Sequence, residues 1–227
     1  MWVNNSDFKQ KIINFAKLKG DEKILDVGIG AGDLSGLFNS KEVTGIDFSK
    51  TMLSECKKLH PEFKLVLADA EKLPFSDEKF DVVCCRNFLQ NFNDPSMAFG
   101  EMVRVTKTGG KIIVIESAVY ENERAFPTDF CRIAEPFHPL FPSHESLFFL
   151  FTKNNIKKIK QMVVGVHKKW LTKWQLSKKT SEEEKIKGYR ICENYPAWYK
   201  KSYKMKFFPE ETEIESTLTF SFIKGEK

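Results

Sequence analysis

The sequence predicts an α/β fold built around a doubly wound, mostly parallel sheet. Short apolar runs that end at turns alternate with helical stretches over about 120 residues, as in successive βαβ units. A glycine cluster follows the first of these runs, and Gly109-Gly110 precedes the fifth. With 227 residues, 41% of them apolar and 30% charged, the chain can bury the core of one such domain.

The apolar runs place the expected strands, and the stretches between them place the helices. We expect strands at residues 23–28, 42–47, 63–68, 80–85 and 111–116. We expect helices at residues 32–39, 49–59 and 95–106, and an earlier one that starts near Ser6 or Asp7. The residues that share one face of this first helix are Phe8, Ile12, Phe15 and Ala16.

Beyond Glu116 the alternation weakens. Residues 118–146 contain four prolines and many phenylalanines without a clear period. Further on, we expect a helix at 147–154, a strand at 156–167, a helix at 181–194 and a last strand at 217–223. The prediction is a single domain over residues 1–227, with a core at 20–117 and two additions at 118–146 and 168–209.

Composition excludes several classes of protein. No apolar run approaches the ~18–20 residues that a membrane-spanning helix needs, so we expect no transmembrane segment. The N-terminus lacks a basic region followed by an apolar stretch, which argues against a secretory signal. The five cysteines show no CxxC spacing, and we interpret them as small core residues in a reducing cytoplasm. The sequence therefore predicts a cytoplasmic protein without a metal site.

The net charge of +5 is unevenly distributed. Residues 1–150 carry a net charge of −4, whereas residues 151–206 carry +12. A local positive potential attracts anions such as phosphate, carboxylate, nucleic acid or an anionic lipid surface. The alternative is an ordinary lysine-rich surface, since only five of the 36 basic residues are arginine.

The sharpest motif is the glycine-rich turn from Asp26 to Gly32, between the first strand and the next expected helix. Glycines permit positive φ angles and let a ligand lie against the backbone, and N–H groups at the start of a helix can face that ligand. Asp47, nineteen residues after Gly28, ends the second strand, where a carboxylate can accept both hydroxyls of a ribose. Dinucleotide-binding folds use a similar turn, but Asp33 stands where their fingerprint has a last glycine, which argues against a dehydrogenase.

Three later segments follow these two in a characteristic order: residues 69–75, 80–83 and 101–111. Together the five segments resemble class I S-adenosylmethionine-dependent methyltransferases, in particular the small-molecule group that includes ubiquinone and menaquinone methyltransferases. The resemblance covers about half of the chain, roughly residues 20–117. It implies a Rossmann-like, seven-stranded, mostly parallel sheet with a reversed last strand, and insertions that form a lid.

The resemblance also implies which residues bind S-adenosyl-L-methionine and its product S-adenosyl-L-homocysteine. Those expected to surround the methionine part are Asp26, Gly28, Ile29, Gly30 and Gly32, with the backbone of Arg86 below it. Those expected at the adenosine part are Asp47 for the ribose, Phe48 and Met52 for the adenine ring, and Asp69 with Ala70 for its amino group. Alternatively, Asp26 only orients the glycine turn, Met52 is a core residue, and Asp69 forms a turn.

For the methyl acceptor, the resemblance favours a small apolar or aromatic molecule, which can also be anionic, methylated by in-line displacement. No catalytic residue is assigned; the candidate general bases are His138, His144, Tyr195 and Tyr199. Residues 87–91 contain amides where the family often has histidines. The two additions are expected to face the substrate. Trp170 and Trp174 could cover the active site, contact anionic lipid, stack on bases or simply pack.

Two other functions are compatible with the sequence. The first is an RNA or protein methyltransferase that holds its substrate with the basic segment 151–206; nucleic acid is not favoured, because no Asn-Pro-Pro-Tyr-type tetrapeptide follows the fourth strand. The second is a non-catalytic S-adenosylmethionine-binding regulator. The fold does not fix the acceptor chemistry, so O-, N-, S- and C-methylation all remain open, as does the oligomeric state.

Overall fold

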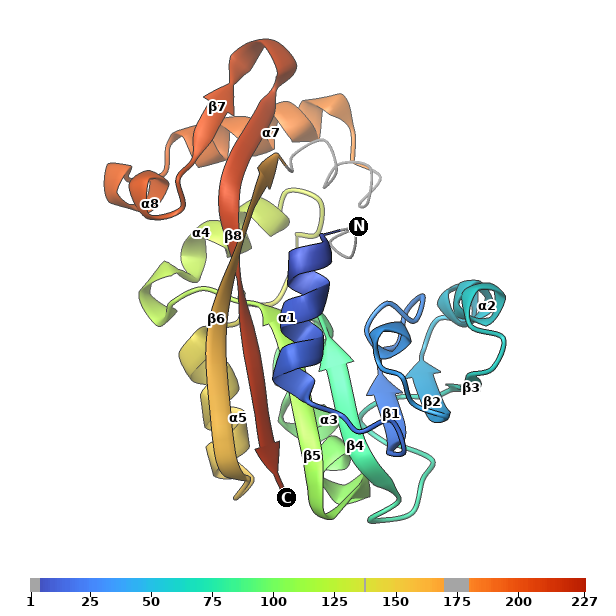
Figure 1. Cartoon of the computed structure of the whole chain (residues 1–227). Helices are drawn as coiled ribbons and strands as arrows, with labels where there is room; N and C mark the ends of the chain where they lie inside the picture. Colours follow the sequence, from blue (N-terminus) through green and yellow to red (C-terminus); the bar gives the residue numbers. More distant parts are fainter. Residues whose placement is uncertain (1–4, 137, 170–179) are drawn as a thin grey trace.

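The computed structural model describes residues 5–136, 138–169 and 180–227, and it contains one twisted sheet with helices on both faces (Figure 1). The strands are β1 (Lys23–Val27), β2 (Glu42–Asp47), β3 (Lys64–Leu67), β4 (Phe80–Arg86), β5 (Thr106–Ser117), β6 (Lys157–Lys169), β7 (Lys206–Phe208) and β8 (Glu213–Glu226). Their order in the sheet is β3-β2-β1-β4-β5-β8-β6, and β7 pairs with β8. This arrangement confirms the Rossmann-like, mostly parallel sheet.

The strands β1 to β5 run parallel, and β8 runs antiparallel between β5 and β6. The reversed last strand is therefore confirmed. The sheet has eight strands rather than seven, because the short β7 pairs with the first residues of β8. No apolar run marks β7 in the sequence, because this strand contains only two apolar residues, Phe207 and Phe208, before Pro209.

The longer helices are α1 (Ser6–Ala16), α2 (Lys50–Leu59), α3 (Ser96–Val105), α5 (His144–Lys153) and α7 (Glu182–Glu193), and the shorter are α4 (Ala125–Cys131) and α8 (Ala197–Ser202). Short 3₁₀ turns are η1 (Ser35–Leu37), η2 (Leu89–Asn91), η3 (Glu121–Glu123) and η4 (Pro209–Glu211). The first helix is capped by Asn5, whose side chain accepts the N–H of Phe8, rather than by Ser6 or Asp7.

The expected helix at residues 32–39 is wrong, because only the single turn η1 forms there. Gly32 has φ = +90°, outside the helical region, and Gly36 is a second poor helix former. A Cβ atom on Gly36 would lie 2.6 Å from the His60 ring, so the segment packs closely against α2 and its end. As a consequence, no α-helix begins at the glycine-rich turn to present its N–H groups.

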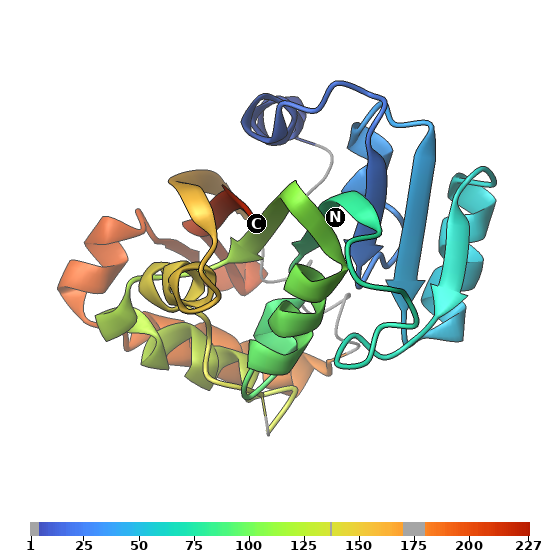
Figure 2. The ribbon, with the colours of Figure 1, turned by 90° about the horizontal axis from the view of Figure 1, so that it is seen from below.

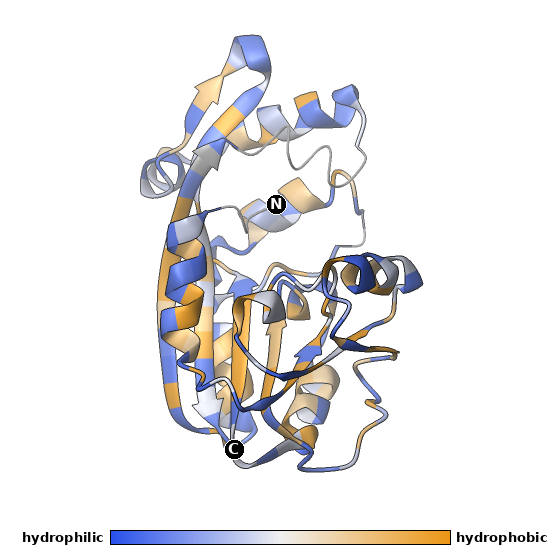
Figure 3. Cartoon of the chain, turned by 45° about the vertical axis from the view of Figure 1, so that its right-hand side comes forward, coloured by the Kyte–Doolittle hydropathy of each residue, from blue (hydrophilic) through white to orange (hydrophobic). Residues whose placement is uncertain are grey.

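Two apolar clusters lie on opposite faces of the sheet (Figure 2). One joins α3 and α5 to the sheet through residues such as Phe99, Met102 and Phe151. The other joins α1, α2 and the η1 segment through Phe8, Ile12 and Cys56. Figure 3 shows the middle strands coloured mostly as hydrophobic, as strands covered on both faces must be. Cys84 and Cys85 in β4 are fully buried, which confirms that they are core residues.

A third cluster lies beyond the carboxyl ends of the parallel strands (Figure 1). It joins α4, α7, α8 and the start of β8, and it is rich in tyrosine. Tyr203 donates its hydroxyl proton to Glu123 Oε2 at 2.5 Å, and Tyr195 donates to the carbonyl of Phe126 at 2.5 Å. These bonds satisfy the phenols of Tyr195 and Tyr203. Residues of both sequence additions contribute to this cluster, so the additions share a core of their own.

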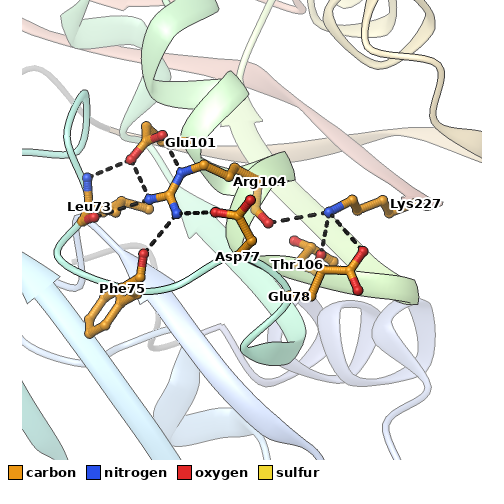
Figure 4. A network of polar contacts seen from close by, with 8 residues as sticks. All are labelled: Leu73, Phe75, Asp77, Glu78, Glu101, Arg104, Thr106 and Lys227. Carbon is orange, nitrogen blue, oxygen red and sulfur yellow. Dashed lines mark hydrogen bonds and ion pairs between the residues drawn. The ribbon is translucent and has the colours of Figure 1, made fainter.

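A network of polar contacts around Arg104 stabilises the end of the sheet opposite to the tyrosine-rich cluster (Figure 4). Its guanidinium donates to the carboxylates of Glu101 and Asp77 and to the carbonyls of Leu73 and Phe75. These bonds tie α3 to the connection between β3 and β4. No helix in the described ranges is both long and apolar enough to cross a membrane.

Candidate functional site

The glycine-rich turn follows β1 and has the backbone that the motif predicts. Gly28, Gly30 and Gly32 have φ angles of +69°, +56° and +90°. A Cβ would lie 2.1 Å from a neighbouring side chain at Gly28 and 2.6 Å from one at Gly32, so glycine is required at these two positions. The side chain of Ile29 points into the apolar cluster against Gly45, where a Cβ atom would lie 2.1 Å from it. Ile29 can therefore contribute only backbone groups to a ligand.

Asp47 lies at the end of β2 and connects this strand to the glycine-rich turn. Its Oδ2 accepts the N–H of Gly30 at 3.0 Å, and its Oδ1 accepts the N–H of Ser49 at 2.9 Å. The residue is 8% exposed. Each carboxylate oxygen has a second lone pair for a further donor. The two signals read separately from the sequence thus form one hydrogen-bonded unit.

Two large apolar side chains flank this unit in the β2–α2 region. Phe48 is 83% exposed, an unusual state for a phenylalanine in a folded domain, and Met52 is 37% exposed. The Cε of Met52 lies 3.6 Å from the position that a Cβ on Gly30 would take. Met52 is therefore not a core residue but lies against the glycine-rich turn, with Phe48 near the start of the same helix.

Asp26, directly before the turn, is almost completely buried and points to η1. Its Oδ2 accepts the hydroxyl proton of Ser35 at 2.5 Å. Burial raises the pKa of Asp26 to about 7, because the ionised carboxylate loses its hydration. The contact with Ser35 favours the interpretation that Asp26 orients the turn.

Arg86 ends β4 with a side chain that is only 9% exposed. Its nearest acidic partner is the exposed Asp33, 4.0 Å away, and its Nε has no hydrogen-bond partner among the described residues. Burial lowers the pKa of this guanidinium, an effect that the charges of Asp33, Asp26 and Glu116 oppose. The expectation for Arg86 concerned its backbone; the structure adds a buried, incompletely paired side chain.

Phe88 is a site neighbour that the sequence reasoning missed. A Cβ on Gly28 would lie 2.1 Å from the Cδ2 of Phe88, so its ring packs directly on the glycine-rich turn. The ring also makes an edge contact with Phe92 at 5.2 Å between centroids. The position of residues 87–91 directly after a strand could have suggested a role, but not this contact.

Asp69 and Ala70 follow β3, at the same edge of the sheet. The side chain of Asp69 is exposed, and its Oδ1 accepts the N–H of Glu71 at 2.9 Å, a local turn bond. Ala70 is buried in the α3–α5 cluster. The residues implied for the adenosine part thus come from β2 and β3, while those for the methionine part come from β1 and β4.

The four candidate bases have different surroundings. Tyr195 and Tyr199 belong to the tyrosine-rich cluster, and burial raises the pKa of both phenols. His144 is the first residue of α5, and burial lowers its pKa. His138 lines a cavity of about 310 Å³ together with Asn91 and Glu135. Trp170 and Trp174 lie outside the described residues.

Comparison with known proteins identifies the domain. Residues 25–114 match the family model described as methyltransferase domain. The demethylmenaquinone methyltransferase of Renibacterium salmoninarum is 40% identical over 97 residues, a match that covers 42% of this chain and 41% of that protein. The chain spans about half the length of the curated relatives it matches, between 41% and 53%.

Solved structures share the whole fold. The YcgJ protein of Bacillus subtilis is 21% identical, with a TM-score of 0.88 over 98% of this chain and 99% of that chain. Phosphoethanolamine N-methyltransferase 2 of Haemonchus contortus, solved with S-adenosyl-L-methionine, is 17% identical, with a TM-score of 0.63 over 98% of this chain and 53% of that one. The solved structures show the shared fold, while the family model and the curated relatives confirm the resemblance of residues 25–114 to S-adenosylmethionine-dependent methyltransferases of the ubiquinone and menaquinone group.

Proposed function

We propose that this chain transfers a methyl group from S-adenosylmethionine to a small acceptor by in-line displacement. The observation that carries the proposal is the hydrogen bond from Gly30 to Asp47, which joins the glycine-rich turn to the carboxylate at the end of β2. Both features lie at the carboxyl edge of a doubly wound sheet, where such folds bind nucleotides.

The residues at this edge fit the parts of the cofactor. Gly30, where the nearest atom to a Cβ would be the Cε of Met52 at 3.6 Å, leaves room for a ligand along the backbone. Asp47 retains lone pairs for two ribose hydroxyls. The exposed ring of Phe48 and the side chain of Met52 offer an apolar surface for adenine, with Asp69 and the backbone of Ala70 for its amino group. When bound, S-adenosylmethionine supplies a methyl group made electrophilic by the sulfonium.

The acceptor is proposed to enter between the connection after β4 and the additions at 118–146 and 168–209. The cavity lined by Asn91, Glu135 and His138 lies between the connection after β4 and the first of these additions. Relatives of the matched segment are named demethylmenaquinone methyltransferases, which supports a small aromatic acceptor of the quinone class. Of the phenylalanines in 126–151, Phe126, Phe130 and Phe151 pack into the apolar clusters rather than line this cavity.

His138 is the candidate base if the acceptor must lose a proton. Its Nδ1 lies 2.7 Å from the carbonyl of Pro139, so Nδ1–H donates there and the neutral ring keeps Nε2 as acceptor. Nε2 lies 3.8 Å from Glu135 Oε2, a carboxylate that would stabilise the imidazolium. A positioned base typically contributes 10²–10⁴-fold, whereas alignment of the reactants can contribute ~7–11 kcal/mol.

The direct experiment supplies the purified chain with methyl-labelled S-adenosylmethionine and demethylmenaquinone. We expect label in the quinone and an equal amount of S-adenosylhomocysteine. Label that appears only in added RNA or protein, with binding that weakens steeply as salt rises, would support the macromolecular alternative instead. Cofactor binding without transfer to these acceptors or to any small molecule of a cell extract would support a regulator.

A further inference from the structure

The connection after β4 is held by Glu116, a residue with no role in the expected site. Glu116 lies near the end of β5 and is completely buried. Its Oε1 accepts the N–H of Phe88 at 2.6 Å and that of Leu89 at 2.8 Å. One carboxylate oxygen therefore fixes the backbone of the turn that places the Phe88 ring on Gly28.

Other contacts indicate that this turn needs to be held. Asn87 has φ = +48°, a left-handed conformation that is uncommon for residues other than glycine and that asparagine adopts more readily than most. Its N–H donates to the carbonyl of Ile115 at 2.9 Å, and its Oδ1 accepts the N–H of Ser117 at 3.0 Å. These hydrogen bonds join the ends of β4 and β5 around Asn87, and Glu116 supplies the carboxylate acceptor among them.

The second oxygen of Glu116 differs from the first. Its Oε2 is buried and has no hydrogen-bond partner in the described part of the chain. The charged group that acts on Glu116 is Arg86 of β4, itself incompletely paired. Cys85 of β4 is a neighbouring thiol, Asp26 of β1 acts on Arg86, and the register partner on β8 is the uncharged Ser221. Burial raises the pKa of Glu116 to about 7, so a carboxylate at this place titrates near neutral pH.

We propose that Glu116 is a positioning residue for the cofactor site, which acts through Phe88 and Leu89 and does so fully only as a carboxylate. Ionised oxygen accepts N–H bonds more strongly than neutral oxygen, because the bonds become charge-assisted. An ionised Glu116 therefore orders the turn over Gly28, whereas the protonated form holds it less tightly. This inference rests on the proposed binding of S-adenosylmethionine at the glycine-rich turn.

The test compares S-adenosylhomocysteine affinity of wild type and Glu116→Gln by titration calorimetry from pH 6 to pH 8.5. Gln keeps an acceptor oxygen and mimics the protonated acid, so the two proteins should bind alike at pH 6. Above pH 8 the variant should bind about tenfold more weakly, since it lacks the charge-assisted bonds. The quantity compared is the ratio of the two affinities at each pH. Titration of Asp26 occurs in both proteins and therefore cancels in this ratio.

The matched control is Glu123→Gln. Glu123 is also a buried carboxyl, 6% exposed, and accepts a hydrogen bond from Tyr203, but it belongs to the tyrosine-rich cluster. Its substitution should leave the affinity for S-adenosylhomocysteine equal to wild type at every pH. If Glu116→Gln does not fold, Asp26→Asn serves as the second variant, in which affinity should still rise with pH through the ionisation of Glu116.

The outcomes separate the two proposals. A wild type that binds no S-adenosylhomocysteine contradicts the proposed function. A wild type that binds, with a Glu116→Gln affinity ratio that is the same at pH 6 and pH 8.5, contradicts only the positioning role, because a purely steric role of the side chain would not depend on pH. A flat pH profile in Asp26→Asn would contradict it as well.

Discussion

Two arginines near opposite ends of the sheet have contrasting surroundings. Arg104, at the end of α3, donates hydrogen bonds to two carboxylates and two carbonyls, and these bonds raise its pKa. Arg86, at the end of β4, has one carboxylate at 4.0 Å, an unpartnered Nε in the part of the chain described, and a pKa lowered by burial. Arg104 joins α3 to the connection between β3 and β4. Arg86 lies buried beside the glycine-rich turn, and its Nε can still donate a hydrogen bond.

The same contrast holds for the carboxylates. Glu101 is paired with Arg104, which holds its pKa below the usual value. Asp26 and Glu116 are buried near Arg86, but neither forms an ion pair as close as that of Glu101 with Arg104. Burial raises the pKa of each to about 7. Groups held in this way cost stability, and such clusters are typical of functional sites. From this comparison we expect the end around Arg104 to contribute mainly to stability, and the proposed site around Arg86 to contribute mainly to binding.

The largest expected effect is that of Gly28→Ala at the binding end. The new Cβ would clash with Phe88 at 2.1 Å and would strain a residue with φ = +69°. We expect the affinity for S-adenosylhomocysteine to fall at least ~100-fold, about 2.7 kcal/mol, in titration calorimetry. The control is Gly100→Ala in α3, where a Cβ meets nothing within 4 Å. This variant should bind S-adenosylhomocysteine as wild type does, and its free energy of unfolding should rise by ~0.5–1 kcal/mol. Equal affinities of the two variants would contradict the role of the turn.

The fold and the glycine–aspartate unit could be predicted because they depend on local patterns. Glycines with positive φ leave a sequence signature, and Asp47 ends a clear apolar run. The contacts of Phe88 with Gly28, and of Glu116 with Phe88, join residues far apart in sequence, for which a single chain carries no signature. The expected helix at 32–39 was wrong because Gly32 and Gly36 oppose helix formation there.

At the stability end, Arg104→Met should lower the free energy of unfolding by about 2–3 kcal/mol, because it leaves the Leu73 and Phe75 carbonyls and two carboxylates without their donor. Urea unfolding measures this effect. The folded variant should bind S-adenosylhomocysteine as wild type does. If the variant instead lost affinity for S-adenosylhomocysteine without losing stability, the surroundings of Arg104 would serve binding rather than stability, contrary to our expectation.

The corresponding change at the binding end is Arg86→Met. We expect about tenfold weaker binding of S-adenosylhomocysteine, because Arg86 balances the charges of Asp26 and Glu116 beside the turn. At pH 6 the free energy of unfolding should change by less than ~1 kcal/mol, because Asp26 and Glu116, whose pKa values are about 7, are then mostly protonated and leave no unpaired buried charge. An unfolding penalty as large as that of Arg104→Met would erase the distinction between the two arginines.

The smallest expected effect is a pH dependence of stability. The pKa of Asp26 is raised in the folded state, so its contribution is full below its unfolded pKa near 3.8 and is lost as pH rises towards about 7. Between pH 6 and pH 7, wild type should therefore lose about 1 kcal/mol relative to Asp26→Asn, which does not titrate there. Urea unfolding of both proteins at the two pH values measures the free energies of unfolding. If this free energy changes equally with pH in wild type and in Asp26→Asn, Asp26 is not held as a buried acid.

The central claim is that the glycine-rich turn and Asp47 together hold S-adenosylmethionine. The most direct measurement is titration of the folded wild type and of Asp47→Ala with S-adenosylhomocysteine, with circular dichroism to verify that both are folded. We expect one site in wild type and at least ~100-fold weaker binding in the variant, which lacks the carboxylate that bonds Gly30. Equal binding by both proteins, or binding of a nicotinamide dinucleotide in place of S-adenosylhomocysteine, would contradict the account.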